Sequence, residues 1–435
     1  MYYGGGFGDY PNDNDFCCNG IITSDRHVTP KLQQVKKVYQ YVDFRLTDEG
    51  KVRIRNRYCI HDMGANNLKY ELLRDGRVIK SGVTNMPAVQ PTDSIDMDMP
   101  VTVPEGKGMY HLNLSLELKQ ATIWAPAGHS VAAEQLCLKD DMDFNLDFPA
   151  KVEKAFSASE TDDAIIVKGK DWSFGISKKD GAVTDLTYGG KQMLAEGENF
   201  LFNGYRSINN DRLGNLNATR EEVLVKLIQN DKWTKVFATQ IVKGGRDGRS
   251  KVPVATEYEF LPDGKILLTV TIANGEKNID FRRLGVQAFL DKSLENVEYL
   301  GRGPMENYPD RKDCAFVGCY TNTVSGMQEE YIKPQSMGER CDVNWVQLTD
   351  NNGKGIRFTS LVNTFMFSAQ HYTDEDLWQT KYLHELKNIR KPEVVLHLDA
   401  AMRGLGNGSC GPGPLLKYEM EKGHHRMFMC ISPVK

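Results

Sequence analysis

Strict alternation of apolar and polar residues is the feature of this sequence that most restricts its fold. In HLNLSLEL, residues 111–118, four leucines fall on one face of an extended chain and the polar residues fall on the other. KVRIRNRYCI, residues 51–60, alternates in the same way. Dipeptides typical of tight hairpin turns separate such runs, at Asp75-Gly76, Asp180-Gly181, Asp263-Gly264 and Asn352-Gly353. These patterns predict an all-β protein of the sandwich type.

Helix signals are sparse by comparison. DEDLWQ, residues 374–379, is a short helix candidate, and EEVLVKLIQ, residues 221–229, fits either a helix or a strand. No other segment shows a convincing helical period, so we expect few helices in the folded chain.

The strand pattern divides the chain into two bodies. Residues 27–138 hold short strand-like runs over about a hundred residues, the size of an immunoglobulin-like sandwich. The acidic stretch 139–163 has little strand pattern and predicts a connection. Strands then continue at hairpin spacing over residues 164–435, which predicts a large antiparallel sandwich.

The opening stretch, MYYGGGFGDYPNDNDFCCNGIITSDR, fits neither body. It lacks the apolar core of a secretory signal. It is also too rich in tyrosine and phenylalanine for an ordinary disordered tail. We therefore expect residues 1–26 to form an element that packs against another surface.

Charge and cysteine content narrow the class of protein. The formal net charge of −4 is spread along 435 residues without a basic cluster, so we expect neither nucleic acid nor a membrane surface as partner. The nine cysteines form no C-x-x-C pair, which predicts free, mostly buried thiols rather than a disulfide framework or a zinc site.

Reduced thiols favour a cytoplasmic setting, and nothing else in the sequence indicates a location.

The densest polar segment is LGRGPMENYPDRKDCAFVGCY, residues 300–320, followed by YIKPQSMGERCDVNWVQLTD. It predicts a buried loop in which Arg302, Glu306, Asn307, Asp310 and Arg311 satisfy one another and the nearby backbone. Glu306 could serve as a general acid, but glycosidases need two facing carboxylates and the sequence shows no partner. An ion-paired structural role is the simpler interpretation.

Two other motifs do not indicate a binding site. GLGNGSCGPGP, residues 404–414, is rich in glycine, but Pro412 and Pro414 exclude the helix that a dinucleotide-binding loop requires. His424 and His425 are adjacent, and neighbouring residues of a strand point to opposite faces, so we expect no metal site there.

The motifs GRGPMENYPDR, residues 301–311, and YIKPQSMGERCDVNW, residues 331–345, resemble the signature of the last domain of the large β-galactosidases of glycoside hydrolase family 2. NFLFNGYRSINNDRLG, residues 199–214, is similar to that domain's Arg-Ala-Pro-x-Asp-Asn-Asp stretch, although it reads Arg206-Ser207-Ile208 where the family has Arg-Ala-Pro. FGDYPNDNDFCCNGIITSDRHVTPKLQQVKKVYQ, residues 7–40, resembles the segment that leaves the catalytic barrel and enters the fourth domain.

This resemblance implies the C-terminal portion of such an enzyme. Residues 1–26 would be the end of a TIM barrel, residues 27–138 the fourth domain, and residues 164–435 a supersandwich like that of galactose mutarotases. The family's two catalytic glutamates lie on barrel strands that would precede this chain, so the resemblance implies no catalytic residue here.

The resemblance also implies peripheral site residues within PNDNDFCCNG, residues 11–20. Phe16 would offer its carbonyl to a sodium ion and close its ring over the sugar. Asn19 would offer its side-chain oxygen to the same ion and touch the sugar. An aspartate from another domain completes that sodium site in the family, so this chain would supply it only in part. The resemblance also allows magnesium in the full-length enzyme, but no ligand for it can be assigned in this chain. The family's last glycine-rich loop carries a sugar-stacking tryptophan, and this chain has Cys410 there, so stacking would be lost.

Two functions follow as hypotheses. The chain is either the C-terminal portion of a β-galactosidase, inactive alone on a galactoside sugar and dependent on the missing N-terminal and barrel portion, or a free-standing carbohydrate-binding or assembly module without catalysis. The full-length enzyme would be a homo-oligomer. Retention of the barrel-end segment with its sodium motif favours the first hypothesis.

Overall fold

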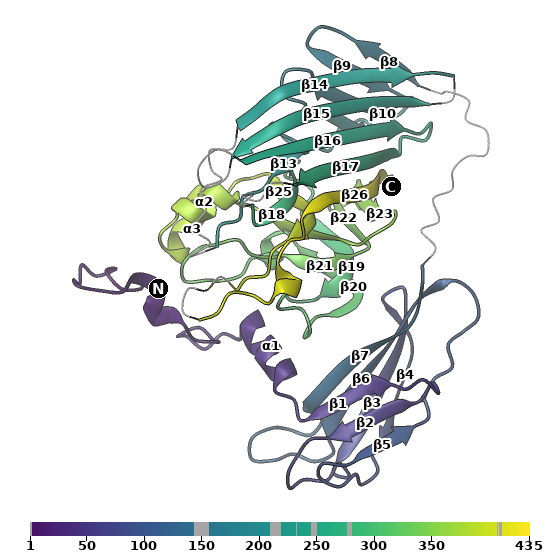
Figure 1. The fold of residues 1–435 in the computed structure, drawn as a ribbon, viewed down its shortest axis with the longest axis vertical. Helices are drawn as coiled ribbons and strands as arrows, with labels where there is room; N and C mark the ends of the chain where they lie inside the picture. Colours follow the sequence, from purple (N-terminus) through teal and green to yellow (C-terminus); the bar gives the residue numbers. More distant parts are fainter. Residues whose placement is uncertain are drawn as a thin grey trace.

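The computed structural model describes residues 2–142, 156–208, 219–231, 233–244, 250–275, 281–406, 408 and 411–435. Strands make up 49% of the structure and helices 8%, which confirms the all-β prediction. Two bodies of strands are visible in Figure 1, with the N-terminal segment beside the larger one. Residues 143–155 of the predicted connection lie outside the described residues, and the exact domain bounds stay predictions.

The first body is a sandwich of two antiparallel sheets. One sheet has the order β1 (Val42–Leu46), β2 (Val52–Asn56), β5 (Ser94–Met97), and the other has the order β4 (Arg77–Asn85), β3 (Asn66–Arg74), β6 (Gly108–Leu118), β7 (Ser130–Asp141). The alternating leucines of β6 explain the packing, because Leu112, Leu114 and Leu116 are almost completely buried in the core between the sheets. This arrangement is the immunoglobulin-like sandwich that the sequence predicted.

The second body contains three antiparallel sheets. The largest has the order β14 (Thr219–Gln229), β15 (Thr234–Gly244), β16 (Ser250–Phe260), β17 (Ile266–Asn274), β26 (Gly423–Val434), β23 (Gly355–Ser360), β22 (Trp345–Thr349), β19 (Asn296–Gly303), β20 (Phe316–Thr323). A second has the order β13 (Leu201–Asn203), β18 (Arg283–Leu290), β25 (Val394–Met402), β24 (Phe365–Gln370), β21 (Arg340–Val343). The third has the order β12 (Lys191–Gln192), β11 (Val183–Tyr188), β10 (Trp172–Ser177), β9 (Ala164–Lys168), β8 (Ser157–Glu160).

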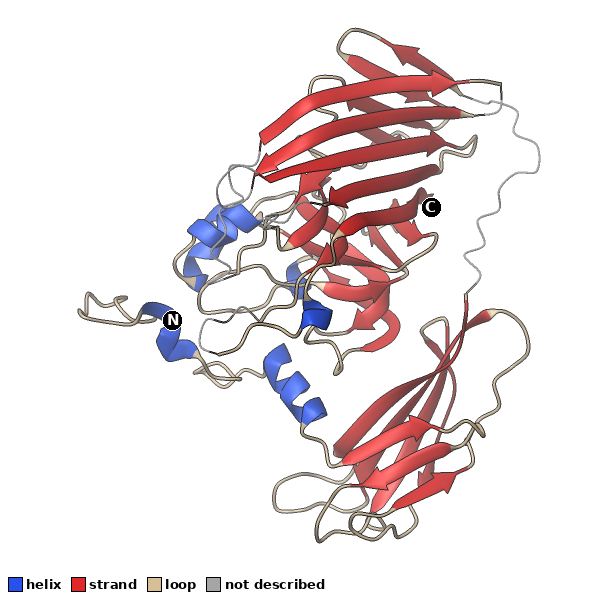
Figure 2. Cartoon of the chain, in the orientation of Figure 1, coloured by secondary structure: helices blue, strands red, loops and turns tan. Residues whose placement is uncertain are grey.

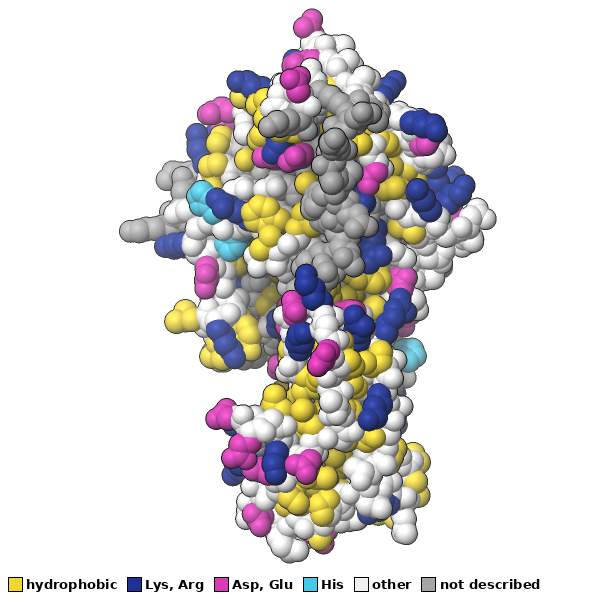
Figure 3. All heavy atoms as spheres, turned by 90° about the vertical axis from the view of Figure 1, so that its right-hand side faces the viewer, with side chains coloured by type: hydrophobic (Ala, Val, Ile, Leu, Met, Phe, Trp, Pro, Cys, Tyr) yellow, Lys and Arg dark blue, Asp and Glu magenta, His cyan; other side chains and the backbone are white. Residues whose placement is uncertain are grey.

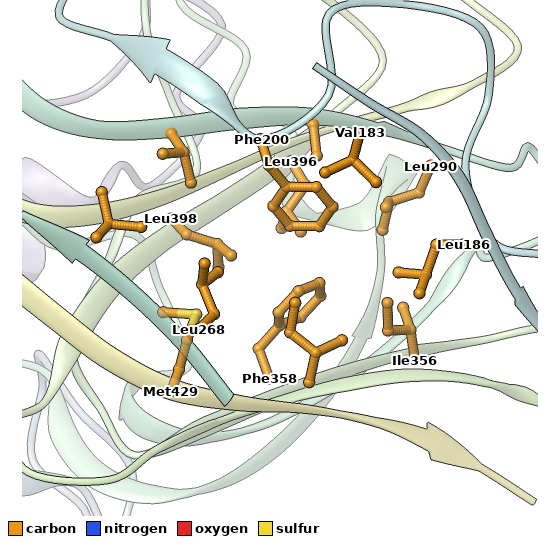
Figure 4. Close-up of a cluster of buried hydrophobic side chains, with 14 of the residues drawn as sticks. Val183, Leu186, Phe200, Leu268, Leu290, Ile356, Phe358, Leu396, Leu398 and Met429 are labelled. Atoms are coloured by element: carbon orange, nitrogen blue, oxygen red, sulfur yellow. The ribbon is translucent and has the colours of Figure 1, made fainter. Parts of the chain in front are cut away.

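One apolar core joins these three sheets. Figure 4 shows Leu268 and Phe358 of the nine-stranded sheet facing Leu396 and Leu398 of β25, with Leu186 of β11 beside them. Because each sheet contributes its apolar face to the same cluster, the second body is a single large sandwich, as predicted.

Helices are few and short, and Figure 2 shows them in the N-terminal segment, between the two bodies and along one side of the second body. They are α1 (Pro30–Val38), α2 (Asp374–Gln379) and α3 (Leu386–Ile389), with 3₁₀ turns η1 (Asn14–Cys18), η2 (Ser325–Met327), η3 (Leu383–Glu385) and η4 (Leu416–Tyr418). The prediction of α2 is confirmed, and a capping box between Thr373 and Asp376 explains where it begins. The ambiguous segment 221–229 is strand, within β14.

The sequence analysis missed α1. Pro30 stands at its first position, which suits a helix start, but only tertiary contacts stabilise so short a helix. Lys37 forms an ion pair with Glu134 of β7 at 2.8 Å, and Gln34 donates a hydrogen bond to Asp313 at 3.0 Å. The helix thus lies between the two bodies.

The two bodies also contact each other directly. Gln135 of β7 makes a paired contact with the backbone of Val317, donating to its carbonyl at 2.8 Å and accepting from its amide at 2.7 Å. Met109 of the first body packs with Leu300 and Val317 of the second. The first sandwich is therefore docked on the β19–β20 end of the second.

Two sequence-based expectations need comment. The eight cysteines that the structure describes are free, as predicted, but only Cys341 and Cys430 are buried, so the expectation of mostly buried thiols is wrong. No helix in the described part of the chain is long and apolar enough to span a membrane.

Candidate functional site

The N-terminal segment and the start of the second signature motif border a hollow of about 470 Å³. Its wall on one side comes from η1 and the residues after it, including Asp15 and Asn19, and on the other from residues 330–335. Lys31 of α1 lies between the two walls and donates a hydrogen bond to the carbonyl of Gly20 at 2.9 Å. Burial and the positive charge of Arg311 lower the pKa of Lys31.

Of the three predicted site residues, one lines the hollow, one lies beside it and one is not described by the structure. Asn19 lines the hollow. Phe16 lies three residues away on η1, with 57% of its surface exposed, and is not part of the hollow's wall. Cys410 lies outside the described residues. The oxygen donors of Asn19 and of the backbone of η1 suit a hard cation such as sodium, so the donor chemistry fits the predicted metal.

The loop formed by the first signature motif, residues 301–311, is here called the signature loop. Its residue Glu306 is a structural carboxylate. Glu306 is fully buried and accepts hydrogen bonds from Arg311, from the Tyr331 hydroxyl and, at 2.9 Å, from the amide of Gly338. All of these partners belong to the two signature motifs. The Glu306 carboxylate thus links the two motifs through hydrogen bonds and an ion pair, as the ion-paired interpretation predicted.

Asp310 of the same loop fixes the start of the glycine-rich segment. Its carboxylate accepts hydrogen bonds from the amides of Leu405 at 2.8 Å and Gly406 at 3.0 Å. A Cβ on Gly404 would lie 2.7 Å from the Asp310 carboxyl group, so only glycine permits this approach. A second hollow of about 430 Å³ lies here, lined by Lys31, Tyr308 and Asp310 among others, and it shares Lys31 with the first.

A second buried charge cluster lies behind the signature loop. Arg283 of β18 contacts three carboxylates, those of Asp374 at 2.6 Å and of Glu339 and Asp399 at 3.1 Å. His397 lies 3.6 Å from Asp374. All five side chains are at most 4% exposed, so the cluster is closed to solvent and substrate.

Burial dominates the protonation of this cluster. Burial and the negative charge of Asp399 raise the pKa of Glu339 to about 8. Burial, opposed by Arg283, raises the pKa of Asp399 to about 7. Arg283 and His397 overcome burial at Asp374 and lower its pKa, and burial together with Arg283 lowers the pKa of His397 to about 3. One arginine thus holds three carboxylates that do not all ionise at neutral pH.

Sequence reasoning missed this second cluster. One signal was available: His397 and Asp399 interrupt the otherwise apolar run VVLHLDAAM of β25, where polar side chains need buried partners. Their partner Arg283 lies more than a hundred residues earlier, on the neighbouring strand β18, so the pairing itself could not be predicted from the sequence.

The buried carboxylates of this region are closed to a substrate. Glu306 and the Arg283 cluster are buried and ion-paired. In the first hollow, Glu330 is 66% exposed, far from the water-excluded setting that a glycosidase acid needs. His424 and His425 lie on β26, and within the described ranges no group of three or more His, Cys, Asp and Glu could hold a metal ion.

Comparison with known families accounts for almost the whole chain. The family model described as "Beta galactosidase small chain" matches residues 168–431. "Beta-galactosidase, domain 4" matches residues 52–139, and "Glycosyl hydrolases family 2, TIM barrel domain" matches residues 1–44. The hollow around Asn19 therefore lies where a barrel-type segment meets the small-chain domain.

Curated relatives agree with these matches. The chain is 26% identical to a beta-galactosidase of Vibrio vulnificus over 99% of its own length, 27% identical to one of Priestia megaterium over 93%, and 28% identical to one of Halalkalibacterium halodurans over 95%. It spans 43%, 40% and 41% of these relatives, so it corresponds to about two fifths of their length.

Solved structures add little. A galactose 1-epimerase from Lactobacillus acidophilus matches 64% of this chain and 98% of its own, with 7% identity and a TM-score of 0.37. A GalM/aldose epimerase homologue from C. elegans also matches 64% of this chain and all of its own, with the same identity and score. Scores this low carry no weight.

Proposed function

This chain belongs to the beta galactosidase small chain family, and from that membership we propose that it is the non-catalytic part of a β-galactosidase, completed by a separate or preceding barrel portion. In the completed enzyme, which would hydrolyse terminal β-galactosides, this chain would form one wall of the sugar site. That wall would be the surface of the hollow that Asn19 lines.

The observation that carries this proposal is the exposure of aromatic side chains around the N-terminal segment. Phe7 is 84% exposed, Tyr10 is 93% exposed and Phe16 is 57% exposed. Tyr3, in contrast, is buried and donates a hydrogen bond to the carbonyl of Lys381 at 2.7 Å. The segment is thus anchored on the second body while it presents an apolar surface, which is typical of a docking site for another protein part. A free-standing module gains nothing from such a surface.

An association measurement tests this proposal. The probe is the separately produced N-terminal portion of the Priestia megaterium relative, which contains the segment missing here, and analytical ultracentrifugation reports complex formation. We expect the double variant Phe7→Ser, Tyr10→Ser to weaken association at least about tenfold, because two exposed aromatic anchors are lost. Ile123→Ser, at a fully exposed position of the first sandwich, is the matched control and should change nothing. Equal binding by the double variant would contradict the proposal.

Sodium belongs to the same proposal. The Phe16 carbonyl and the Asn19 side-chain oxygen would supply two oxygen ligands, and the other portion would supply a carboxylate. When bound, the ion would orient sugar hydroxyl groups. Sodium-23 line broadening should therefore increase when the two portions are combined, and Asn19→Leu should remove the increase. An unchanged line width would count against the assignment of these ligands.

Self-association of the completed enzyme is expected through the first sandwich. Figure 3 shows hydrophobic side chains gathered over this body, and its edge strand β4 exposes Val78, Ile79 and Val83. Edge strands of this kind pair readily with other chains. If Val83→Lys leaves the oligomeric state of the completed enzyme unchanged, this edge is not its interface.

A further inference from the structure

Two neighbouring cysteines lie in the wall of the first hollow. Cys17 and Cys18 end the 3₁₀ turn η1, and their sulfur atoms are 3.6 Å apart. Cys17 is exposed and Cys18 is half-buried, and both line the hollow with Asn19. Reagents in solution can therefore reach both thiols from the same side.

The separation of the sulfur atoms decides which chemistry suits the pair. A disulfide needs sulfurs about 2.05 Å apart and α-carbons usually at least about 4.4 Å apart. Neighbouring α-carbons are only about 3.8 Å apart across a trans peptide bond. The observed 3.6 Å is instead a separation that one larger atom, bonded to both sulfurs, can bridge without moving the backbone. Soft atoms with high affinity for sulfur are the ones that thiols select.

We propose that Cys17 and Cys18 form a dithiol site for a soft, thiophilic atom that needs only two protein ligands, with trivalent arsenicals as the ligand class. In the reaction with an organic arsenic(III) oxide, both As–O bonds break and two As–S bonds form. The two thiol protons leave on the oxygen as one molecule of water. Arsenic stays trivalent, so no oxidant or reductant takes part.

The surroundings of the pair suit this condensation. A bridged arsenical would project its organic group into the hollow beside Asn19. If the proposed function holds, the same reagent would then block sugar binding in the completed enzyme.

Intact-mass spectrometry under native conditions tests the site on the full chain. The probe is phenylarsine oxide at one equivalent. We expect one adduct per chain, with the mass of the probe less one water. Cys17→Ser and Cys18→Ser should each weaken retention at least about a hundredfold, because chelation by two linked thiols is lost. Excess dimercaptopropanol, a dithiol, should remove the adduct, whereas the monothiol mercaptoethanol should not.

Matched controls use the other exposed cysteines. Cys59 and Cys137 lie on different segments of the first sandwich, and the variants Cys59→Ser and Cys137→Ser should bind the probe as the unmodified chain does. The proposal is overturned if the unmodified chain retains no arsenical, if either variant in η1 retains it equally, or if a control variant abolishes it. Because the readout is mass, the result does not depend on β-galactosidase activity and stands even if the proposed function fails.

Discussion

Glu306 is the residue whose role separates a catalytic from a structural interpretation of the signature loop. Its only charged partner in the described structure is Arg311, which is 11% exposed and stacks over the Tyr308 ring. We expect Glu306→Gln to lower the free energy of unfolding by about 3–5 kcal/mol, because it leaves the charge of Arg311 buried without a counter-ion. Urea denaturation measures this loss.

The control for Glu306 is Glu298, whose partner Arg77 is 67% exposed. Glu298→Gln should cost less than about 1 kcal/mol, because solvent screens an exposed ion pair. If Glu306→Gln proved as mild as Glu298→Gln, the carboxylate would not be the structural link between the two motifs.

Asp310 gives a second prediction at this scale. Asp310→Asn keeps one acceptor oxygen but turns an amide donor toward the amide of Leu405 or Gly406. We expect the variant to lose about 1.5–3 kcal/mol, the range for a hydrogen bond to a charged group. Amide exchange should accelerate at Leu405 and Gly406. Unchanged protection at both amides would show that Asp310 does not hold the glycine-rich segment.

Individual residues also show how far the sequence could be interpreted. Polar density alone predicted that the residues around Glu306 lie buried and paired, because buried polar groups must find partners. It could not predict that Asp310 bonds to residues 405–406, nor that Arg283 collects three carboxylates. Those pairings join strands and loops far apart in the chain, and local pattern carries no information about them.

Among the elements, the strands β18 and β25, the helix α2 and the residue before β21 bring together the charge cluster that makes stability depend on pH. The folded-state pKa values of Glu339, about 8, and Asp399, about 7, lie above their ordinary values near 4. Their contribution to stability is fully present below about pH 4 and is lost as pH rises through 7 to 8. His397, with a folded-state pKa of about 3, acts oppositely: its contribution is present above about pH 6.5 and is lost toward acid.

The two effects separate between pH 6.5 and 8, where, within this cluster, Glu339 and Asp399 titrate and His397 does not. We expect the free energy of unfolding to fall with rising pH in this window, and Asp399→Asn to reduce the slope, because one proton is no longer released. Urea denaturation at several pH values measures the slope. A slope that is flat in the unmodified chain, or unchanged by Asp399→Asn, would contradict the assigned protonation of the cluster.

Element type was predictable where the residue period was unambiguous. The alternation in residues 111–118 predicted β6, and DEDLWQ, residues 374–379, was a short helix candidate that the structure shows as α2. Residues 221–229 fitted two periods, and pairing with β15 decided in favour of a strand. The helix α1 could not be predicted, because contacts with Glu134 and Asp313 of other segments stabilise it.

At the scale of the whole molecule, the described residues form two large cores, and the segment before α1 exposes aromatic side chains. The cores are those of the first and second bodies. The segment before α1 matches a barrel family and leaves Phe7 and Tyr10 exposed. On the proposed function, this exposed surface would bind the barrel portion, and that portion would supply the bond-breaking carboxylates.

The most direct test is hydrolysis of nitrophenyl β-galactoside by the purified chain, measured with and without the N-terminal portion of the Priestia megaterium relative. We predict background rates for the chain alone, because its buried carboxylates are ion-paired and Glu330, in the wall of the hollow, is exposed. Mixing should produce turnover, and Phe7→Ser, Tyr10→Ser should reduce it. Turnover at enzymatic rates by the chain alone, with contaminating enzyme excluded, would contradict the account.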